Sequence, residues 1–331
     1  YEYFYAQPKG RLEPCLTKSV LLKSVDGMRY YVPDFPRLTP RATDVVPSAT
    51  TNDQGVIETN FENEHTFELA RTWIQTCSET HAFCNRSVPL PRKKILPSRL
   101  IDIGSGSTLT PRLFSTEDWP VETKYMTLSH CWGKHPPLVL TEAKLETFQK
   151  QIDVSALPKT FRDAMEIASS LGQRYIWIDS LCIIQDSPQD WQEQAATMGD
   201  VYHNSWCNIA ATAALDSRFG CFMNRSPLAV LPCKVRAKWM SEPEESFSCS
   251  SFGIWDDAVE NSILNNRGWV LQEMVLAPRV LHFAKSQMFW ECLELRACET
   301  YPMGLPNNIT TKMSLDTYCL RSEPVKANSM K

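Results

Sequence analysis

The sequence contains no apolar run that approaches the length needed to cross a bilayer. A transmembrane helix requires about 20 consecutive apolar residues, whereas the hydrophobic residues, 43% of the 331, are interrupted throughout by polar ones. The opening segment, YEYFYAQPKG, also lacks the basic head and apolar centre of a signal peptide. We therefore expect no membrane span and a cytoplasmic location.

Positive charge is not in excess either. The chain has 34 Lys and Arg residues against 38 Asp and Glu residues, which gives a formal net charge of −4. Domains that bind nucleic acid usually carry a basic patch or stripe on their surface. The charge balance therefore predicts no nucleic-acid partner.

Cysteine pairs of the Cys-x-x-Cys type are missing, although the chain has 12 cysteines. The cysteines are scattered and several lie in apolar runs, which favours reduced core residues over a disulfide framework. Cys77, His81 and Cys84 stand at i, i+4 and i+7, so a helix over residues 67–84 could present three metal ligands on one side. No fourth ligand is evident nearby in the sequence. We interpret this side as a packed helix face and predict no metal.

What the sequence does contain is an alternation of strand and helix patterns around residues 174–186, RYIWIDSLCIIQD. Short apolar, β-branched runs predict strands at residues 126–128, 175–178 and 206–211. Apolar residues at helical spacing predict helices at residues 158–171 and 189–202, the second with Trp191 and Met198 in the core. This alternation predicts an α/β fold in which helices flank a mostly parallel central sheet.

Around this region the chain divides into three parts. Residues 1–66 read as an irregular proline-rich N-terminal segment, residues 67–300 as the folded domain, and residues 301–331 as a polar C-terminal tail. Residues 279–283 and 287–291 flank a short turn and predict an added β-hairpin at the sheet edge, with irregular insertions before it.

Polar side chains gather where two of the predicted strands end. Asp179 follows one strand, and ligands of α/β sheets bind beyond the carboxyl ends of the strands. Residues 129–132, Ser-His-Cys-Trp, end the strand at 126–128. Neighbouring residues on a strand point to opposite faces, so they cannot form a catalytic triad with one another. We interpret them as a polar patch that lines a ligand site rather than as the centre of a Ser or Cys hydrolase.

Four ordered segments carry a resemblance to a known family. They are YMTLSHCWG at residues 125–133, LPKTFRDAMEIASSLGQRYIWIDSLCIIQD at 157–186, DWQEQAATMGDVYHNSWCNIAA at 190–211 and RGWVLQEMVLAPRVLHF at 267–283. They resemble the fungal heterokaryon-incompatibility (HET) domain, to which we assign residues 67–300. The resemblance implies an effector domain of regulated cell death that acts when genetically different fungi fuse, through self-association or a protein partner.

The HET family in turn resembles TIR domains, many of which cleave the nicotinamide–ribose bond of NAD, and this implies a TIR/flavodoxin-like core. TIR enzymes contain a W-x-x-x-E element whose Glu serves catalysis. Here RGWVLQE places Trp269 four residues before Glu273, so the two share one helix face. The resemblance thus implies that Glu273 is the catalytic residue of an NAD glycohydrolase, a hydrolase of N-glycosyl bonds. Such an enzyme requires no cofactor, and NAD is its candidate substrate.

Cleavage of NAD passes through a ribosyl cation, which one carboxylate and an aromatic wall can stabilise. On this interpretation Trp132 or Trp269 supplies the wall, Arg267 binds pyrophosphate oxygens, and Asp179 binds a ribose hydroxyl. The predicted ligand-binding residues are Ser129, Trp132, Asp179, Arg267 and Trp269.

Each of these assignments has a structural alternative. Glu273 and Arg267 could form an ion pair, Trp269 could belong to the core, and Asp179 could cap the backbone of residues 181–183. The choice depends on whether the side chains converge on one place.

Two other functions fit the same pattern. A non-catalytic module for self-association or partner binding would expose aromatic residues such as Trp255 at its interface. A metabolic enzyme would use the same scaffold on another small molecule. One departure bears on activity, because HET domains often carry Glu where this chain has Gln194. If that position serves activity, this domain is altered or inactive.

Overall fold

The computed structural model describes residues 64–85, 95–106, 108–134, 138–225, 254–268 and 270–305, together with the backbone of six further strands. These strands are β1 (Tyr5–Ala6), β2 (Leu21–Lys23), β3 (Arg29–Tyr31), β4 (Arg37–Pro40), β10 (Cys233–Ala237) and β11 (Glu245–Ser250). They form two antiparallel sheets of three strands, β1-β2-β3 and β10-β11-β4. The rest of the fold is built on a third, larger sheet.

The larger sheet has eight strands in the order β14-β13-β12-β9-β7-β8-β5-β6. Their bounds are β5 (Arg99–Asp102), β6 (Arg112–Ser115), β7 (Met126–Ser129), β8 (Tyr175–Trp177), β9 (Cys207–Ala210), β12 (Arg279–Phe283), β13 (Met288–Cys292) and β14 (Arg296–Cys298). Every residue of β7 and β9 is buried, as expected for central strands that are covered on both faces. The three strands predicted around residues 126–128, 175–178 and 206–211 are confirmed.

The strand directions correct one prediction. The strands β12, β9, β7 and β8 run parallel, but four of the seven neighbouring pairs are antiparallel. The α/β class is therefore confirmed, whereas the prediction of a mostly parallel sheet is wrong. The reason lies partly in the connections, because a parallel crossover takes a dozen or more residues and the links β5–β6, β12–β13 and β13–β14 are shorter than that.

Helices provide the long crossovers of the parallel strands. Helix α4 (Lys159–Ser170) lies between β7 and β8 in the chain, and α6 (Pro188–His203) lies between β8 and β9. The remaining helices are α1 (Glu64–Thr80), α2 (Ala82–Asn85), α3 (Leu145–Lys150), α5 (Asp179–Cys182) and α7 (Val270–Leu276). Short turns of 3₁₀ or π helix cover Glu142–Lys144, Val154–Ala156, Asp256–Glu260 and Leu264–Asn266.

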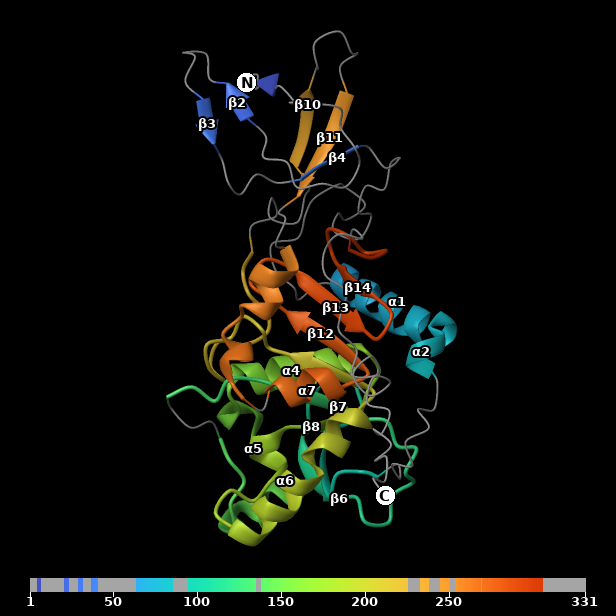
Figure 1. The fold of residues 1–331 in the computed structure, drawn as a ribbon. Helices are drawn as coiled ribbons and strands as arrows, with labels where there is room; N and C mark the ends of the chain where they lie inside the picture. Colours follow the sequence, from blue (N-terminus) through green and yellow to red (C-terminus); the bar gives the residue numbers. More distant parts are fainter. Residues whose placement is uncertain are drawn as a thin grey trace, which may run out of the picture.

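Helices α1 and α2 pack beside β13 and β14, far from them in sequence (Figure 1). The ring of Trp73 in α1 stacks on Trp290 in β13 with 6.2 Å between centroids, and its Nε1 donates to the carbonyl oxygen of Pro302 at 2.7 Å. Contrary to the sequence pattern, the helix is not continuous through residues 67–84, because His81 separates α1 from α2. The N-terminal helix is thus attached to the C-terminal strands.

For two tryptophans the structure reverses the predicted solvent exposure: the one expected on the surface is buried, and the one expected in the core is exposed. Trp255 is 1% exposed and packs edge to face against Phe289 at 5.8 Å and His282 at 5.4 Å. The prediction that it marks an exposed interface is therefore wrong, because the β12–β13 hairpin covers it. Trp191, expected in the core, is 51% exposed on α6. Helical spacing alone did not show where the packed face of α6 ends.

The described cysteines are free, and all of them except Cys84 are buried, which confirms the interpretation as reduced core residues for that part of the chain. Nor do the described residues include a helix whose length and hydrophobicity would let it cross a membrane.

Candidate active site

The carboxyl ends of β7 and β8 bring together side chains that lie about fifty residues apart in the sequence. Asp179 follows β8 as the first residue of α5, and His130 follows β7. Parallel neighbours end at the same sheet edge, so Nδ1 of His130 lies 3.9 Å from Oδ1 of Asp179. Trp132, two residues further, donates its indole N–H to Oδ2 of Asp179 at 2.9 Å. The 129–132 patch therefore lies beside Asp179.

A buried polar network connects β7 to the next parallel strand, β9. Nδ2 of Asn208 donates to Oγ of Ser129 at 2.9 Å, and Thr127 donates its hydroxyl to Oδ1 of Asn208 at 3.0 Å. All three side chains are fully buried. A buried polar group is costly unless it is hydrogen-bonded, so this network holds Ser129 in a fixed position.

Glu273 of α7 lies at the same place. It is 4% exposed, and its Oε2 has no hydrogen-bond partner among the described residues. Burial raises the pKa of this carboxyl to about 7, Asp179 adds to the rise through charge repulsion, and hydrogen bonding to Ser129 and Tyr202 opposes it. These effects place the carboxyl of Glu273 beside Ser129, Tyr202 and Asp179. Near neutral pH it can therefore both give and accept a proton.

His130 completes the cluster with a neutral, buried ring. It is 1% exposed, and neither ring nitrogen has a hydrogen-bond partner among the described residues. Burial lowers its pKa to about 4, the nearby negative charge of Asp179 opposes the shift, and Arg267 contributes to it. The ring meets Phe161 edge to face at 4.9 Å and lies nearly parallel to Trp132 at 6.5 Å. Since His130 does not bond to Ser129, the structure contains no Ser-His pair of the hydrolase type here.

Arg267 provides a positive charge at this site. Its guanidinium donates to the carbonyl oxygen of His130, and its charge lowers the pKa of Glu273. The ion pairs of the described residues do not include one between Arg267 and Glu273, so the structural alternative of a direct pair is not observed.

Comparison with known proteins identifies the region that carries this cluster. Residues 125–273 match the family model of the heterokaryon incompatibility protein (HET). This segment is similar to the HET domain. The match begins just before β7 and ends at Glu273, so it includes each of the side chains described above. No curated protein and no solved structure matches the chain. The resemblance inferred from the four sequence segments is thus confirmed, and it associates the chain with heterokaryon incompatibility in general.

Five of the six predicted site residues come together at the carboxyl edge of the sheet. Ser129 and Asp179 flank the carboxyl of Glu273, and Trp132 contacts Asp179 directly. Trp269 lies outside the described residues. Arg267 lies there too, and its guanidinium donates to the carbonyl oxygen of His130 after β7 rather than to the carboxylate of Glu273. All the predicted site residues that the structure describes therefore lie at one edge of the sheet.

The alternative role of Asp179 as a backbone cap is partly observed. Its Oδ1 accepts a hydrogen bond from the N–H of Ser180 at 2.6 Å, and its carbonyl oxygen accepts one from the N–H of Ile183 at 3.0 Å. Its other carboxylate oxygen is engaged by Trp132 instead. Asp179 therefore both stabilises the first turn of α5 and fixes an aromatic ring of the site.

Sequence reasoning missed two residues near the carboxyl of Glu273. Tyr202 comes from the last turn of α6, donates its hydroxyl to the carbonyl oxygen of Leu128 at 3.3 Å and influences the pKa of Glu273. Asn208 interrupts the otherwise apolar strand β9. A polar residue within a fully buried strand is itself a signal, because it needs a partner. Tyr202 carried no such signal, because an aromatic residue at helical spacing is usually core.

Gln194, where HET domains often carry Glu, lies elsewhere. It is buried on α6, and its Nε2 donates to the hydroxyl of Ser98 at 3.1 Å, next to the start of β5. This contact is with the antiparallel side of the sheet rather than with the cluster around Glu273. At the carboxyl edge itself, the described residues offer no group of metal ligands, and the one such group that they contain lies around Cys292.

Proposed function

We propose that this HET domain hydrolyses the bond between nicotinamide and ribose in NAD, with Glu273 as the catalytic carboxylate. The observation that supports this most is the carboxyl of Glu273 itself, buried at the carboxyl ends of parallel strands with one oxygen unpartnered among the described residues. A buried acceptor without a partner is costly to keep, so it is expected where a substrate will supply the partner.

The reaction needs little more than this carboxylate. The C1′–N bond breaks and nicotinamide departs with the electron pair, leaving a ribosyl cation that a nearby negative charge stabilises. Water then bonds to C1′ and releases a proton. Because its pKa is about 7, Glu273 can accept that proton near neutral pH. No cofactor takes part.

The neighbouring residues suit the other parts of NAD. Asp179 offers carboxylate oxygens to ribose hydroxyls, and Arg267 offers a guanidinium to the pyrophosphate. The indole of Trp132, fixed by its hydrogen bond to Asp179, provides an aromatic wall, and Trp269 is proposed as a second. Ser129 lies beside the carboxyl of Glu273 and lowers its pKa. Asn208 in turn fixes Ser129, which favours a preorganised site.

The wider proposal follows from the family. We propose a TIR/flavodoxin-like core formed by β12, β9, β7 and β8 with α4 and α6, and an effector role in regulated cell death that is triggered by self-association. Four parallel strands with helical crossovers support the core, while the antiparallel strands on both sides are additions to it.

Nicotinamide release from NAD by the purified chain tests the reaction, with Glu273→Gln measured beside it at high protein concentration and after enforced oligomerisation. Glu193→Gln is the matched control, because Glu193 is exposed on α6. Turnover that Glu273→Gln abolishes and Glu193→Gln preserves would support the proposal. Turnover in all three proteins would refute the role of Glu273. Absence of turnover in the wild-type chain would favour a non-catalytic self-association module or an enzyme of another small molecule.

The pH profile provides a second test of the same carboxylate. If Glu273 must be ionised, kcat/KM should rise with pH and level off above about 7, the pKa of its carboxyl. His130 stays neutral over this range because its pKa is about 4, so it adds no second step. A profile that is flat between pH 5 and 9 would contradict the assignment of Glu273.

A further inference from the structure

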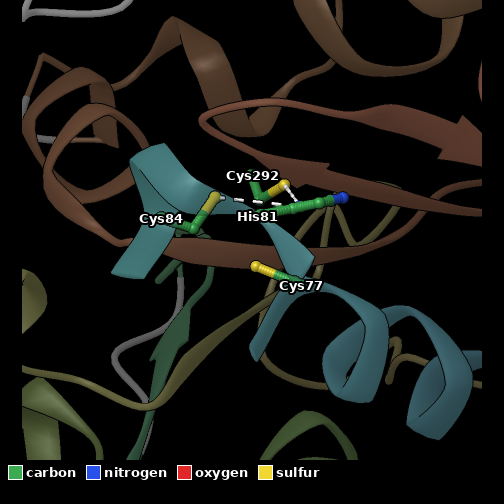
Figure 2. Close-up of side chains that lie close together, drawn as sticks. All are labelled: Cys77, His81, Cys84 and Cys292. Carbon is green, nitrogen blue, oxygen red and sulfur yellow. Dashed lines mark hydrogen bonds between the residues drawn. The ribbon is translucent and has the colours of Figure 1, made fainter. Parts of the chain in front are cut away.

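Four metal-ligand side chains meet at one point far from Glu273. Cys77 comes from α1, His81 from the break after it, Cys84 from α2 and Cys292 from the end of β13 (Figure 2). The sequence shows three of these residues close together but gives no indication of the fourth, which follows more than two hundred positions later. The packing of α1 against β13 supplies it.

The spacing of the donor atoms fits a tetrahedral ion. Zinc bonds of about 2.3 Å to sulfur and 2.0–2.1 Å to nitrogen place two thiolates about 3.8 Å apart, and a thiolate and an imidazole nitrogen about 3.5 Å apart. Nδ1 of His81 lies 3.3 Å from Sγ of Cys292 and 3.9 Å from Sγ of Cys84. The four donor atoms all lie within 4.8 Å of one another. Only small side-chain movements separate this arrangement from a coordination shell.

We propose that Cys77, His81, Cys84 and Cys292 form a structural zinc site. Three thiolates and one imidazole are a usual donor set for tetrahedral Zn²⁺, and four protein ligands leave no open position for a reacting molecule. The prediction of no metal depended on the lack of a fourth ligand, and tertiary structure removes that reason.

A nearby cation suits the charge of such a site. Nε of Arg279 donates to Sγ of Cys77 at 3.3 Å, and Arg279 is also the residue paired with Cys292 between β12 and β13. Three thiolates around Zn²⁺ carry one net negative charge, which the guanidinium offsets. Hydrogen bonds to coordinated thiolates are a common feature of the surroundings of metal sites.

The position of the site indicates what it does. Arg279 begins β12, so the cluster lies at the amino ends of the parallel strands, at the opposite edge of the sheet from Asp179 and Glu273. The ion would tie α1 and α2 to β13, and so connect two segments that the 125–273 family match does not include. The break at His81 fits this role, because it turns α2 so that Cys84 faces the same point as Cys77.

Metal content of the purified chain tests the proposal directly. After expression with zinc available, elemental analysis should find about one zinc ion per chain. Cys292→Ser should lower this at least tenfold, while Cys182→Ser, a change to a buried cysteine in α5, should leave it unchanged. Equal zinc content in wild type and Cys292→Ser would overturn the ligand assignment.

Cobalt binding decides the matter even if Cys292→Ser fails to fold. Wild-type protein, stripped of metal with a chelator under reducing conditions, should bind Co²⁺ with intense visible bands of a tetrahedral site and a thiolate charge-transfer band. It should also unfold at a lower temperature when stripped than after zinc is returned. A wild-type chain that contains no zinc and gives no tetrahedral cobalt spectrum would overturn the proposal and leave a cluster of hydrogen-bonded thiols.

Discussion

At the scale of single residues, the buried carboxyl of Glu273 lowers the stability of the folded chain at neutral pH. Its pKa is about 7 in the folded chain against an ordinary value of 4.5. The folded state therefore binds more protons than the unfolded state between these values, and stability falls as the pH rises through this window. Above pH 7 the accumulated cost is about 3 kcal/mol, since one pKa unit corresponds to about 1.4 kcal/mol.

Glu273→Gln should remove this cost. We expect the variant to be more stable than wild type at pH 8, by up to about 3 kcal/mol, and nearly equal to it at pH 4.5. Urea denaturation at both pH values measures the difference, with the exposed Glu193→Gln as control. A variant that is less stable than wild type at pH 8 would show that the carboxylate has a partner that stabilises its charged form.

The backbone conformation directly after Trp132 requires glycine at position 133. Its φ is +76°, and a Cβ added there would lie 2.3 Å from Cβ of Asp216, which has no room to move aside as a flexible chain end would. Gly172 has nearly the same φ, +73°, but open space around it. Gly172→Ala should therefore cost about 1 kcal/mol through strain alone, and Gly133→Ala about 3 kcal/mol or more because of the added collision. Equal losses in thermal denaturation would show that Asp216 can yield.

At the scale of elements, a buried ion pair attaches the start of α6 to β5, one of the antiparallel strands of the sheet. Asp190 in its first turn accepts two hydrogen bonds from Nη2 of Arg99, at 2.6 and 2.5 Å, and a third from the N–H of Ile184 at 2.8 Å. Both charged side chains are largely buried. This pair joins β5 to the helix that delivers Tyr202 to the site at its other end.

Asp190→Ala should cost about 3–5 kcal/mol, because it leaves the charge of Arg99 and a backbone N–H without a partner in a buried place. The matched control is Glu64→Ala, which removes an exposed ion pair with Arg71 and should cost less than about 1 kcal/mol. Chemical denaturation of both variants gives the comparison. Similar losses for the two would mean that water reaches Arg99 in the folded chain.

At the scale of the whole molecule, the folded unit extends beyond the matched HET segment. Helix α1 precedes residue 125, yet its Trp73 stacks on Trp290 of β13 and is 3% exposed. The strands β12, β13 and β14 come after residue 273 and continue the central sheet. The predicted domain of residues 67–300 stays a prediction, and the packing of α1 supports its N-terminal extension.

Trp73→Ala should lower the free energy of unfolding by about 3–5 kcal/mol, as expected when a buried tryptophan is removed from a core. Trp191→Ala, which removes a 51% exposed tryptophan, should cost less than about 1 kcal/mol. A single unfolding transition in both variants would confirm that α1 and the sheet unfold together. A separate early transition in Trp73→Ala would indicate that α1 is an independent unit.

The sequence by itself determined the local elements and part of the site. Apolar runs located β7, β8 and β9, helical spacing located α4 and α6, and the end of β8 located Asp179 at the carboxyl edge of the sheet. The sequence shows these features because a helix or strand that buries one face carries apolar residues at the spacing of that face.

Only the tertiary structure decided which distant segments meet. It paired the edge strands antiparallel, covered Trp255 with a hairpin, joined Tyr202 to Glu273, and brought Cys292 to Cys77. The hydrophobic period of an element reports which of its faces is buried but carries no record of the element that buries it. For that reason the carboxylate site could be foreseen in outline, while the four-ligand cluster emerged only from the packing of the first helix against a strand near the other end of the described chain.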